Sequence, residues 1–186
     1  ALSGIKDGST ILVSGFGNAG CPVRLLEALI DQGAKNLTIV SNNAGEGEFG
    51  LAALMKARRV RKVICSYPRS SGSIIFEELY AQGEIELGGV PQGTLSERMR
   101  AAGAGIGGFF PPTSAGTLLG KNKETREIEG KLHVFETPLK GDVALIKAHA
   151  GDRWGNLTYN KSARNFGPAM AMSADLTIAE VKIIKE

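Results

Sequence analysis

Three glycines near the amino terminus have a spacing that suits an anionic ligand. Residues 14–30, SGFGNAGCPVRLLEALI, contain a Gly-x-Gly-x-x-Gly pattern formed by Gly15, Gly17 and Gly20. Such glycines let backbone N–H groups approach a ligand at a helix N-terminus, where negative charge is favoured. The pattern therefore predicts either a nicotinamide or flavin dinucleotide site or a site for another extended ligand.

A dinucleotide site also needs a carboxylate, because an Asp or Glu about 20 residues further on binds the ribose hydroxyls. Asn42 and Asn43 occupy that place, and Glu46 and Glu48 come several residues later. The residues thus favour another ligand over a nicotinamide. A nicotinamide-dependent oxidoreductase domain stays open as the alternative.

The glycines are flanked by alternating strand and helix patterns. Short β-branched runs predict strands at 10–14, 36–41, 62–67, 84–90, 142–147 and 176–184, and helical spacing predicts helices at 22–32, 49–57, 73–82 and 94–102. This alternation predicts an α/β fold: an open, mostly parallel sheet with helices on both faces. A Gly/Pro-rich loop after Gly103, a hairpin at 124–138 and the additional strands complete the C-terminal half. No repeat or linker divides the chain, so a single domain over 1–186 is expected.

Composition excludes several classes of protein. The 22 Lys and Arg residues exceed the 19 Asp and Glu residues by only three, which does not favour nucleic acid or an anionic membrane as a partner. Cys21 and Cys65 lack the paired spacing of a zinc site, and His133 and His149 have no acid or cysteine at ligand spacing, so no metal site is expected. No apolar run reaches the roughly 20 residues of a membrane span. A cytoplasmic location is expected.

Several ordered motifs carry a family resemblance. The stretches DGSTILVSGFGNAGCP (7–22), VSNNAG (40–45), PQGTLSERMRAAGAG (91–105), ALIKA (144–148) and DRWGNLTYNKSARNFGPAMA (152–171) resemble the α-subunit of family I CoA-transferases. The resemblance implies the CoA-transferase version of the NagB/RpiA-like α/β fold. Ser14 stands where the family has the first glycine of Gly-Gly-Phe, and Ala115 stands where it has a tyrosine. The stretches CSYPRSSGS, KETREIEG and GDRWGNLTY resemble most the family members that use 3-oxoadipate.

The resemblance implies a reaction and a partner. Members of this family exchange CoA between two carboxylic acids through a glutamate on the β-subunit, which forms a covalent glutamyl-CoA intermediate. For this chain the resemblance implies transfer from succinyl-CoA to a 3-oxo acid, with 3-oxoadipate expected. The chain is then an α-subunit that is active only with its β-subunit, in a heterodimer or heterotetramer. Succinyl-CoA and small carboxylic acids are substrates, and no permanently bound cofactor is expected. A subunit of an acetoacetate-type enzyme and a non-catalytic CoA-binding domain remain alternatives.

The matching motifs also imply site residues. Gln92 lies between a predicted strand and a predicted helix, where its side-chain amide can donate to a developing negative oxygen. Arg69 and its neighbouring serines could bind the distal carboxylate of a 3-oxo dicarboxylate, although a solvated arginine is the alternative. The residues expected to bind CoA or substrate are Gly15, Phe16, Gly17, Gly20, Asn42, Asn43, Arg69, Gly105 and Gly107. Asn42 and Asn43 could equally cap a local turn.

Overall fold

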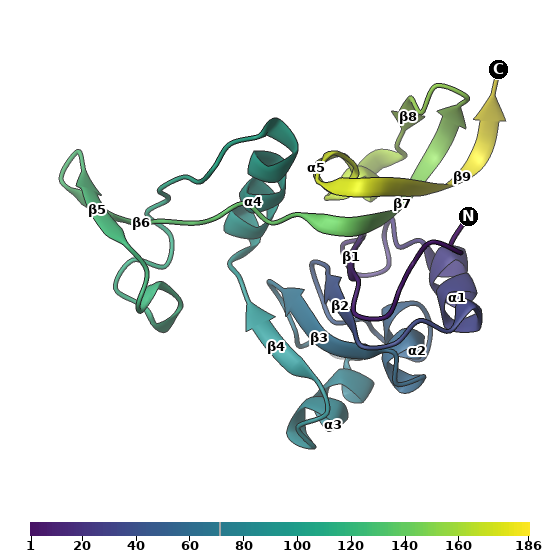
Figure 1. Cartoon of the computed structure of the whole chain (residues 1–186), viewed down its shortest axis with the longest axis horizontal. Helices are drawn as coiled ribbons and strands as arrows, with labels where there is room; N and C mark the ends of the chain where they lie inside the picture. The colour runs from purple at the N-terminus through teal and green to yellow at the C-terminus, as the bar shows by residue number, and fades with distance from the viewer. Residues whose placement is uncertain (71) are drawn as a thin grey trace.

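A seven-stranded sheet organises the protein (Figure 1). The computed structural model describes residues 1–70 and 72–186. The strands are β1 (Thr10–Val13), β2 (Leu37–Val40), β3 (Val60–Cys65), β4 (Glu86–Gly89), β7 (Gly141–Asp152), β8 (Leu157–Thr158) and β9 (Ala174–Lys185). Their order is β4-β3-β2-β1-β7-β8, and β9 also pairs with β7. Every pair is parallel except β7 with β8, so the predicted mostly parallel α/β sheet is confirmed.

Helices cover both faces of the sheet, as predicted. They are α1 (Val23–Gln32), α2 (Leu51–Lys56), α3 (Ile74–Ala81), α4 (Gln92–Ala104) and α5 (Gly167–Met172), with 3₁₀ turns η1 (Leu118–Gly120) and η2 (Lys161–Arg164). Successive strand residues point to opposite faces. Accordingly, Ile11 packs in one buried cluster with α1, α2 and α3, whereas Leu12 packs in a second cluster with α4 and α5.

The first helix shows how local sequence sets the boundaries of an element. Leu26 and Leu29 are fully buried on one face of α1, as their helical spacing predicts. The helix follows Pro22 and ends at Gly33, whose φ of 96° is left-handed and whose N–H donates to the Leu29 carbonyl. Glycine tolerates that backbone conformation, so it stops the helix before β2.

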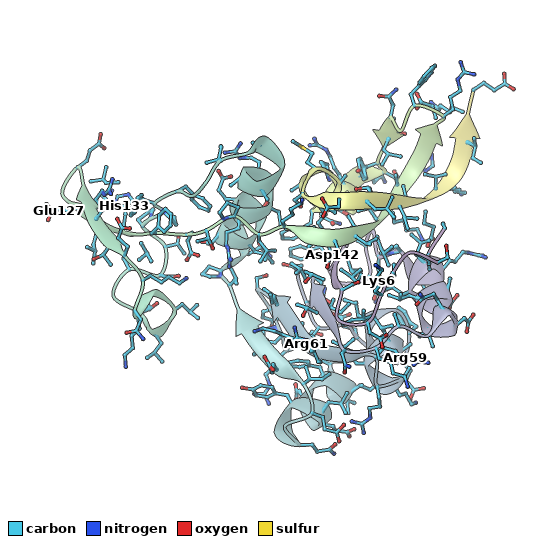
Figure 2. The ribbon with its side chains drawn as sticks, viewed as in Figure 1. Lys6, Arg59, Arg61, Glu127, His133 and Asp142 are labelled. Atoms are coloured by element: carbon cyan, nitrogen blue, oxygen red, sulfur yellow. The ribbon has the colours of Figure 1, made fainter. Side chains whose placement is uncertain are left out.

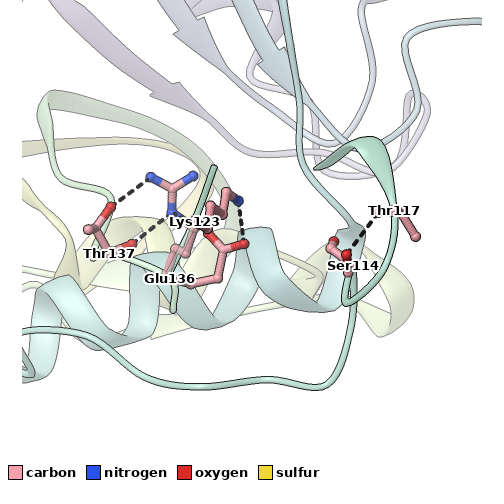
Figure 3. Close-up of polar contacts among 6 residues, drawn as sticks. Ser114, Thr117, Lys123, Glu136 and Thr137 are labelled. Carbon is pink, nitrogen blue, oxygen red and sulfur yellow. Dashed lines mark hydrogen bonds and ion pairs between the residues drawn. The ribbon is translucent and has the colours of Figure 1, made fainter. Parts of the chain in front are cut away.

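A separate hairpin lies away from the main sheet (Figure 1). Its strands β5 (Thr125–Ile128) and β6 (Lys131–Val134) are antiparallel, which confirms the hairpin expected at 124–138. The buried Glu136 carboxylate accepts a hydrogen bond of 2.6 Å from Lys123 Nζ (Figure 3). Arg98 of α4 donates from Nε to the Thr137 carbonyl at 2.7 Å. The first contact joins the two flanks of the hairpin, and the second joins the segment after the hairpin to α4.

The C-terminal strands are longer than the sequence predicts. The parallel pairing of β7 with β9 runs from Gly141 opposite Ala174 to Asp152 opposite Lys185. The residues that lengthen β7 and β9 pair with each other. The sequence pattern around either strand does not predict this pairing, because the two strands are far apart in the chain. Helix α5 was not predicted either, because its sequence GPAMAM begins with Gly-Pro, a pair that is typical of turns.

Candidate functional site

One cavity lies where the carboxyl ends of four parallel strands meet. It has a volume of about 430 Å³ and is lined by Phe16, Gly17, Asn42, Asn43, Glu46, Ser66, Tyr67 and Gln92. The loops after β1, β2 and β3 and the start of α4 after β4 supply these residues. Ligands bind at this edge in open α/β sheets. The structure therefore brings together five of the residues expected from the sequence: Phe16, Gly17, Asn42, Asn43 and Gln92.

Asn42 connects the loops after β2, β3 and β4. Its side chain is buried, with only 3% of the residue exposed. The Asn42 Oδ1 accepts hydrogen bonds from Ser66 Oγ at 2.7 Å and from Gln92 Nε2 at 2.8 Å. The Asn42 carbonyl also accepts the backbone N–H of Ser66 at 3.2 Å and that of Tyr67 at 3.0 Å. The loop after β3 thus holds Asn42 in place, and Asn42 in turn binds the Gln92 amide at the start of α4.

Asn43 lines the cavity and also stabilises its own turn. Its Oδ1 accepts the Gly45 N–H at 2.9 Å, and its carbonyl accepts a hydrogen bond from Ser41 Oγ. This is the local turn bonding that the sequence left as an alternative to ligand binding. Asn43 is therefore part of the cavity wall with its oxygen atoms already in use.

The three glycines of the amino-terminal pattern have different environments. Gly17 lines the cavity at the strand ends. Gly15 lies beside a hollow of only about 10 Å³, and its N–H donates to Asn165 Oδ1 at 3.1 Å. Gly20 is buried, and a Cβ there would lie 2.5 Å from the Ala163 carbonyl oxygen. The structure brings only Gly17 to the cavity, because the other two contact the segment around η2.

The serine that departs from the family pattern has a structural role. Ser14 Oγ donates to the Gly20 carbonyl at 2.7 Å and accepts the Lys147 N–H at 3.1 Å. Its side chain is buried. The hydroxyl thus ties the loop after β1 to strand β7, a link that a glycine would lack.

Three further predicted residues lie outside the cavity. Gly105 ends α4, and Gly107 follows it. At 1.5 Å per residue, the 13-residue α4 separates Gly105 from Gln92 by about 20 Å. The Arg69 side chain is 76% exposed, its Nε lies 3.2 Å from Glu77 Oε1, and it borders a different hollow of about 250 Å³. A ligand-binding role for these three residues stays a prediction.

Sequence reasoning missed two cavity residues, Ser66 and Tyr67, and did not assign Glu46 to the site. Ser66 and Tyr67 follow the carboxyl end of β3, so the rule that found Asn42 and Asn43 would have found them as well. Glu46 is half-buried and is the one charged side chain among the described residues that line the cavity. The wall therefore offers mainly neutral side-chain donors and acceptors.

Neither the two cysteines nor the two histidines line this cavity. Burial raises the pKa of the Cys21 thiol to about 11 and that of Cys65 to about 12, so both are protonated near neutral pH. His133 lies on the hairpin (Figure 2), and its Nδ1 is 2.8 Å from the Lys131 carbonyl oxygen. Within residues 1–70 and 72–186, no group of three His, Cys, Asp or Glu side chains could hold a metal ion. No helix of that same part is long and apolar enough to cross a membrane.

Several curated proteins with similar sequences are named as subunits of CoA-transferases. The chain is 63% identical over 186 residues to a 3-oxoadipate CoA-transferase subunit of Pseudomonas putida, covering all of this chain and 80% of that protein. It is 59% identical over 181 residues to the protein of the same name from Acinetobacter baylyi, covering 97% and 79% of the two chains. It is 47% identical over 184 residues to a succinyl-CoA:3-ketoacid coenzyme A transferase subunit of Helicobacter pylori, covering 99% and 78%.

Solved structures share the fold at lower sequence identity. Glutaconate coenzyme A-transferase from Acidaminococcus fermentans superposes with a TM-score of 0.82 at 18% identity, covering 97% of this chain and 64% of that one. An acyl-CoA transferase from Escherichia coli O157:H7 gives a TM-score of 0.81 at 22% identity, covering 100% and 41%. The family model "Coenzyme A transferase" matches residues 1–186. The chain therefore belongs to the coenzyme A transferase family.

Proposed function

We propose that this chain is the α-subunit of an enzyme that moves CoA from succinyl-CoA to 3-oxoadipate. The observation that carries the proposal is the pair of side-chain amides, Asn42 and Gln92, joined by a 2.8 Å hydrogen bond in a cavity at the carboxyl edge of the sheet. The names of the relatives from Pseudomonas putida and Acinetobacter baylyi support the acceptor. The partner is a β-subunit that supplies the nucleophilic glutamate.

In this mechanism the glutamate carboxylate attacks the thioester carbonyl carbon, and the CoA thiolate leaves to give a mixed anhydride. The thiolate then attacks the glutamyl carbonyl, which yields glutamyl-CoA and free succinate. The acceptor carboxylate repeats these steps in reverse order. Each attack places negative charge on a carbonyl oxygen, and a positioned N–H donor stabilises that charge. The amide of Gln92 has two N–H groups, so one can serve the oxygen while the other bonds Asn42.

Two observations bear on the alternatives. Asn42 stands at the end of β2 where a dinucleotide site needs a carboxylate, and this does not support a nicotinamide-dependent domain. The Helicobacter pylori relative is named for 3-ketoacids in general, so an acetoacetate-type enzyme remains the second candidate. Comparing kcat/KM for 3-oxoadipate and acetoacetate in the assembled enzyme distinguishes the two acceptors.

The need for a partner is tested by mixing. We expect the purified chain alone to show no CoA transfer, and the chain mixed with its β-subunit to show transfer with ping-pong kinetics. Incubation with succinyl-CoA should leave a CoA mass on a β-subunit glutamate. A CoA mass on Glu46, the acidic residue of the cavity, would contradict the proposal, as would turnover by partner-free protein. The mass of the active complex decides between heterodimer and heterotetramer, and a cytoplasmic location stays a prediction.

The role of Gln92 is tested by Gln92→Ala in the assembled enzyme. Removing one oxyanion donor typically lowers kcat about 10²- to 10³-fold, and we expect a loss in that range. Gln82→Ala is the control, since Gln82 is an exposed glutamine at the end of α3. An unchanged kcat for Gln92→Ala would return this residue to a turn-stabilising role.

A further inference from the structure

Ser66 lines the cavity although no step of the proposed mechanism uses it. It follows β3 directly and is half-buried. Its Oγ lies 2.7 Å from Asn42 Oδ1 and 3.1 Å from the Asn42 carbonyl oxygen. Both neighbours are acceptors, so the single hydroxyl hydrogen of Ser66 is directed at Asn42.

This contact favours one orientation of the Asn42 side-chain amide. A side-chain amide has an acceptor oxygen and a donor NH₂ group, and rotation by 180° exchanges them. With the oxygen inward, Asn42 Oδ1 accepts from both Ser66 Oγ and Gln92 Nε2. With the NH₂ group inward, it would confront the Nε2 donor of Gln92. The Ser66 hydroxyl therefore stabilises the orientation in which Asn42 Oδ1 accepts the hydrogen bond from Gln92 Nε2.

We propose that Ser66 is a positioning residue for transfer, acting through Asn42 to hold the Gln92 amide in place. The inference rests on the proposed function, in which Gln92 donates to the developing oxyanion. A flexible donor must be ordered during the reaction, whereas a preorganised donor stabilises the charge at no further cost. Ser66 thus acts on kcat through Asn42 and Gln92.

The chain is suited to a clean test of this role. The backbone N–H groups of Ser66 and Tyr67 also bond the Asn42 carbonyl, at 3.2 and 3.0 Å, and these bonds do not depend on the serine hydroxyl. Ser66→Ala should therefore fold and assemble while losing the hydroxyl. Ser66→Thr keeps the hydroxyl. Ser9→Ala is a matched control, because Ser9 is also half-buried and its Oγ accepts one hydrogen bond, from the Lys6 N–H, at the opposite end of the strands.

The experiment measures steady-state transfer by the assembled complex. We expect Ser66→Ala to lower kcat about tenfold, because the variant loses one hydrogen bond that orders Asn42 and Gln92. KM for succinyl-CoA should change less than about twofold. Ser66→Thr should restore most of kcat, and Ser9→Ala should leave it unchanged. In a Gln92→Ala background, Ser66→Ala should cost much less, because the residues act as one unit.

Four results would overturn the inference: an unchanged kcat in Ser66→Ala, failure of Ser66→Thr to restore it, an equal loss in Ser9→Ala, or additive effects with Gln92→Ala. A second readout does not depend on turnover. The side-chain amide NMR signals of Asn42 and Gln92 in the complex should shift in Ser66→Ala and stay in place in Ser9→Ala. If the wild-type complex transfers no CoA, the proposed function fails, and these signals alone decide whether Ser66 orients the two amides.

Discussion

Gly20 provides a sharp test of whether the amino-terminal glycines serve packing or a ligand. The residue has a φ of 78°, and a Cβ at this position would lie 2.5 Å from the Ala163 carbonyl oxygen and 3.0 Å from Asn165 Nδ2. Gly8 has nearly the same φ, 80°, but a Cβ there would meet no atom within 4 Å. Comparing Gly20→Ala with Gly8→Ala therefore separates the contact from the backbone strain, which both variants share.

The magnitude follows from the contacts that must move. A left-handed alanine costs about 1–2 kcal/mol in either variant. In Gly20→Ala the η2 segment must also shift by roughly 0.9 Å to restore an ordinary contact. That shift weakens the hydrogen bonds of Asn165 to Gly15 and Ala19, which are 3.1 and 2.9 Å long. At about 0.5–1.5 kcal/mol per bond, Gly20→Ala should be about 1–3 kcal/mol less stable than Gly8→Ala.

Thermal unfolding followed by circular dichroism measures this difference. For a chain of this size, each kcal/mol lowers Tm by about 2–4 °C, so Tm of Gly20→Ala should lie roughly 2–12 °C below that of Gly8→Ala. In the assembled enzyme, KM for succinyl-CoA should be similar in the two variants. Equal Tm values together with a raised KM in Gly20→Ala would refute the packing argument and return Gly20 to the ligand site.

Three further predictions concern charged and thiol groups. Arg69 lies outside the cavity and pairs with Glu77 at the surface, so Arg69→Ala should change kcat/KM for 3-oxoadipate and acetoacetate by the same factor. A loss confined to 3-oxoadipate would instead support the carboxylate-binding role that the sequence predicts for Arg69. Glu136→Gln should lower the free energy of unfolding in urea by about 1–3 kcal/mol, because the buried carboxylate holds the Lys123 ammonium at 2.6 Å; unchanged stability would contradict this. Burial raises the pKa values of Cys21 and Cys65 from 9.0 to about 11 and 12, so the unfolded chain loses its thiol protons first and stability should fall as pH rises above 9. Iodoacetamide should label these thiols slowly at pH 8, and labelling at the rate of a free cysteine would contradict their burial.

Much of the site was predictable because it depends on local patterns and one topological rule. β-branched runs separated by helical spacing predict parallel strands, and parallel strands place their carboxyl ends at one edge. Asn42, Asn43 and Gln92 follow such strand ends in the sequence, and the structure places them in one cavity. No knowledge of distant contacts was needed, since each residue's position relative to its own strand sufficed.

The sequence determined the alternation of strands and helices, the end of α1 at Gly33 and the strand ends that supply the cavity, because these features depend on neighbouring residues. The tertiary structure decided which glycines meet the cavity and how far the last strands extend. Gly15 bonds Asn165, 150 positions away, and β7 lengthens only where β9 pairs with it. It also decided that Arg69 borders a separate hollow. These features depend on packing between segments far apart in the chain, and a local sequence pattern does not specify which distant segment packs against it.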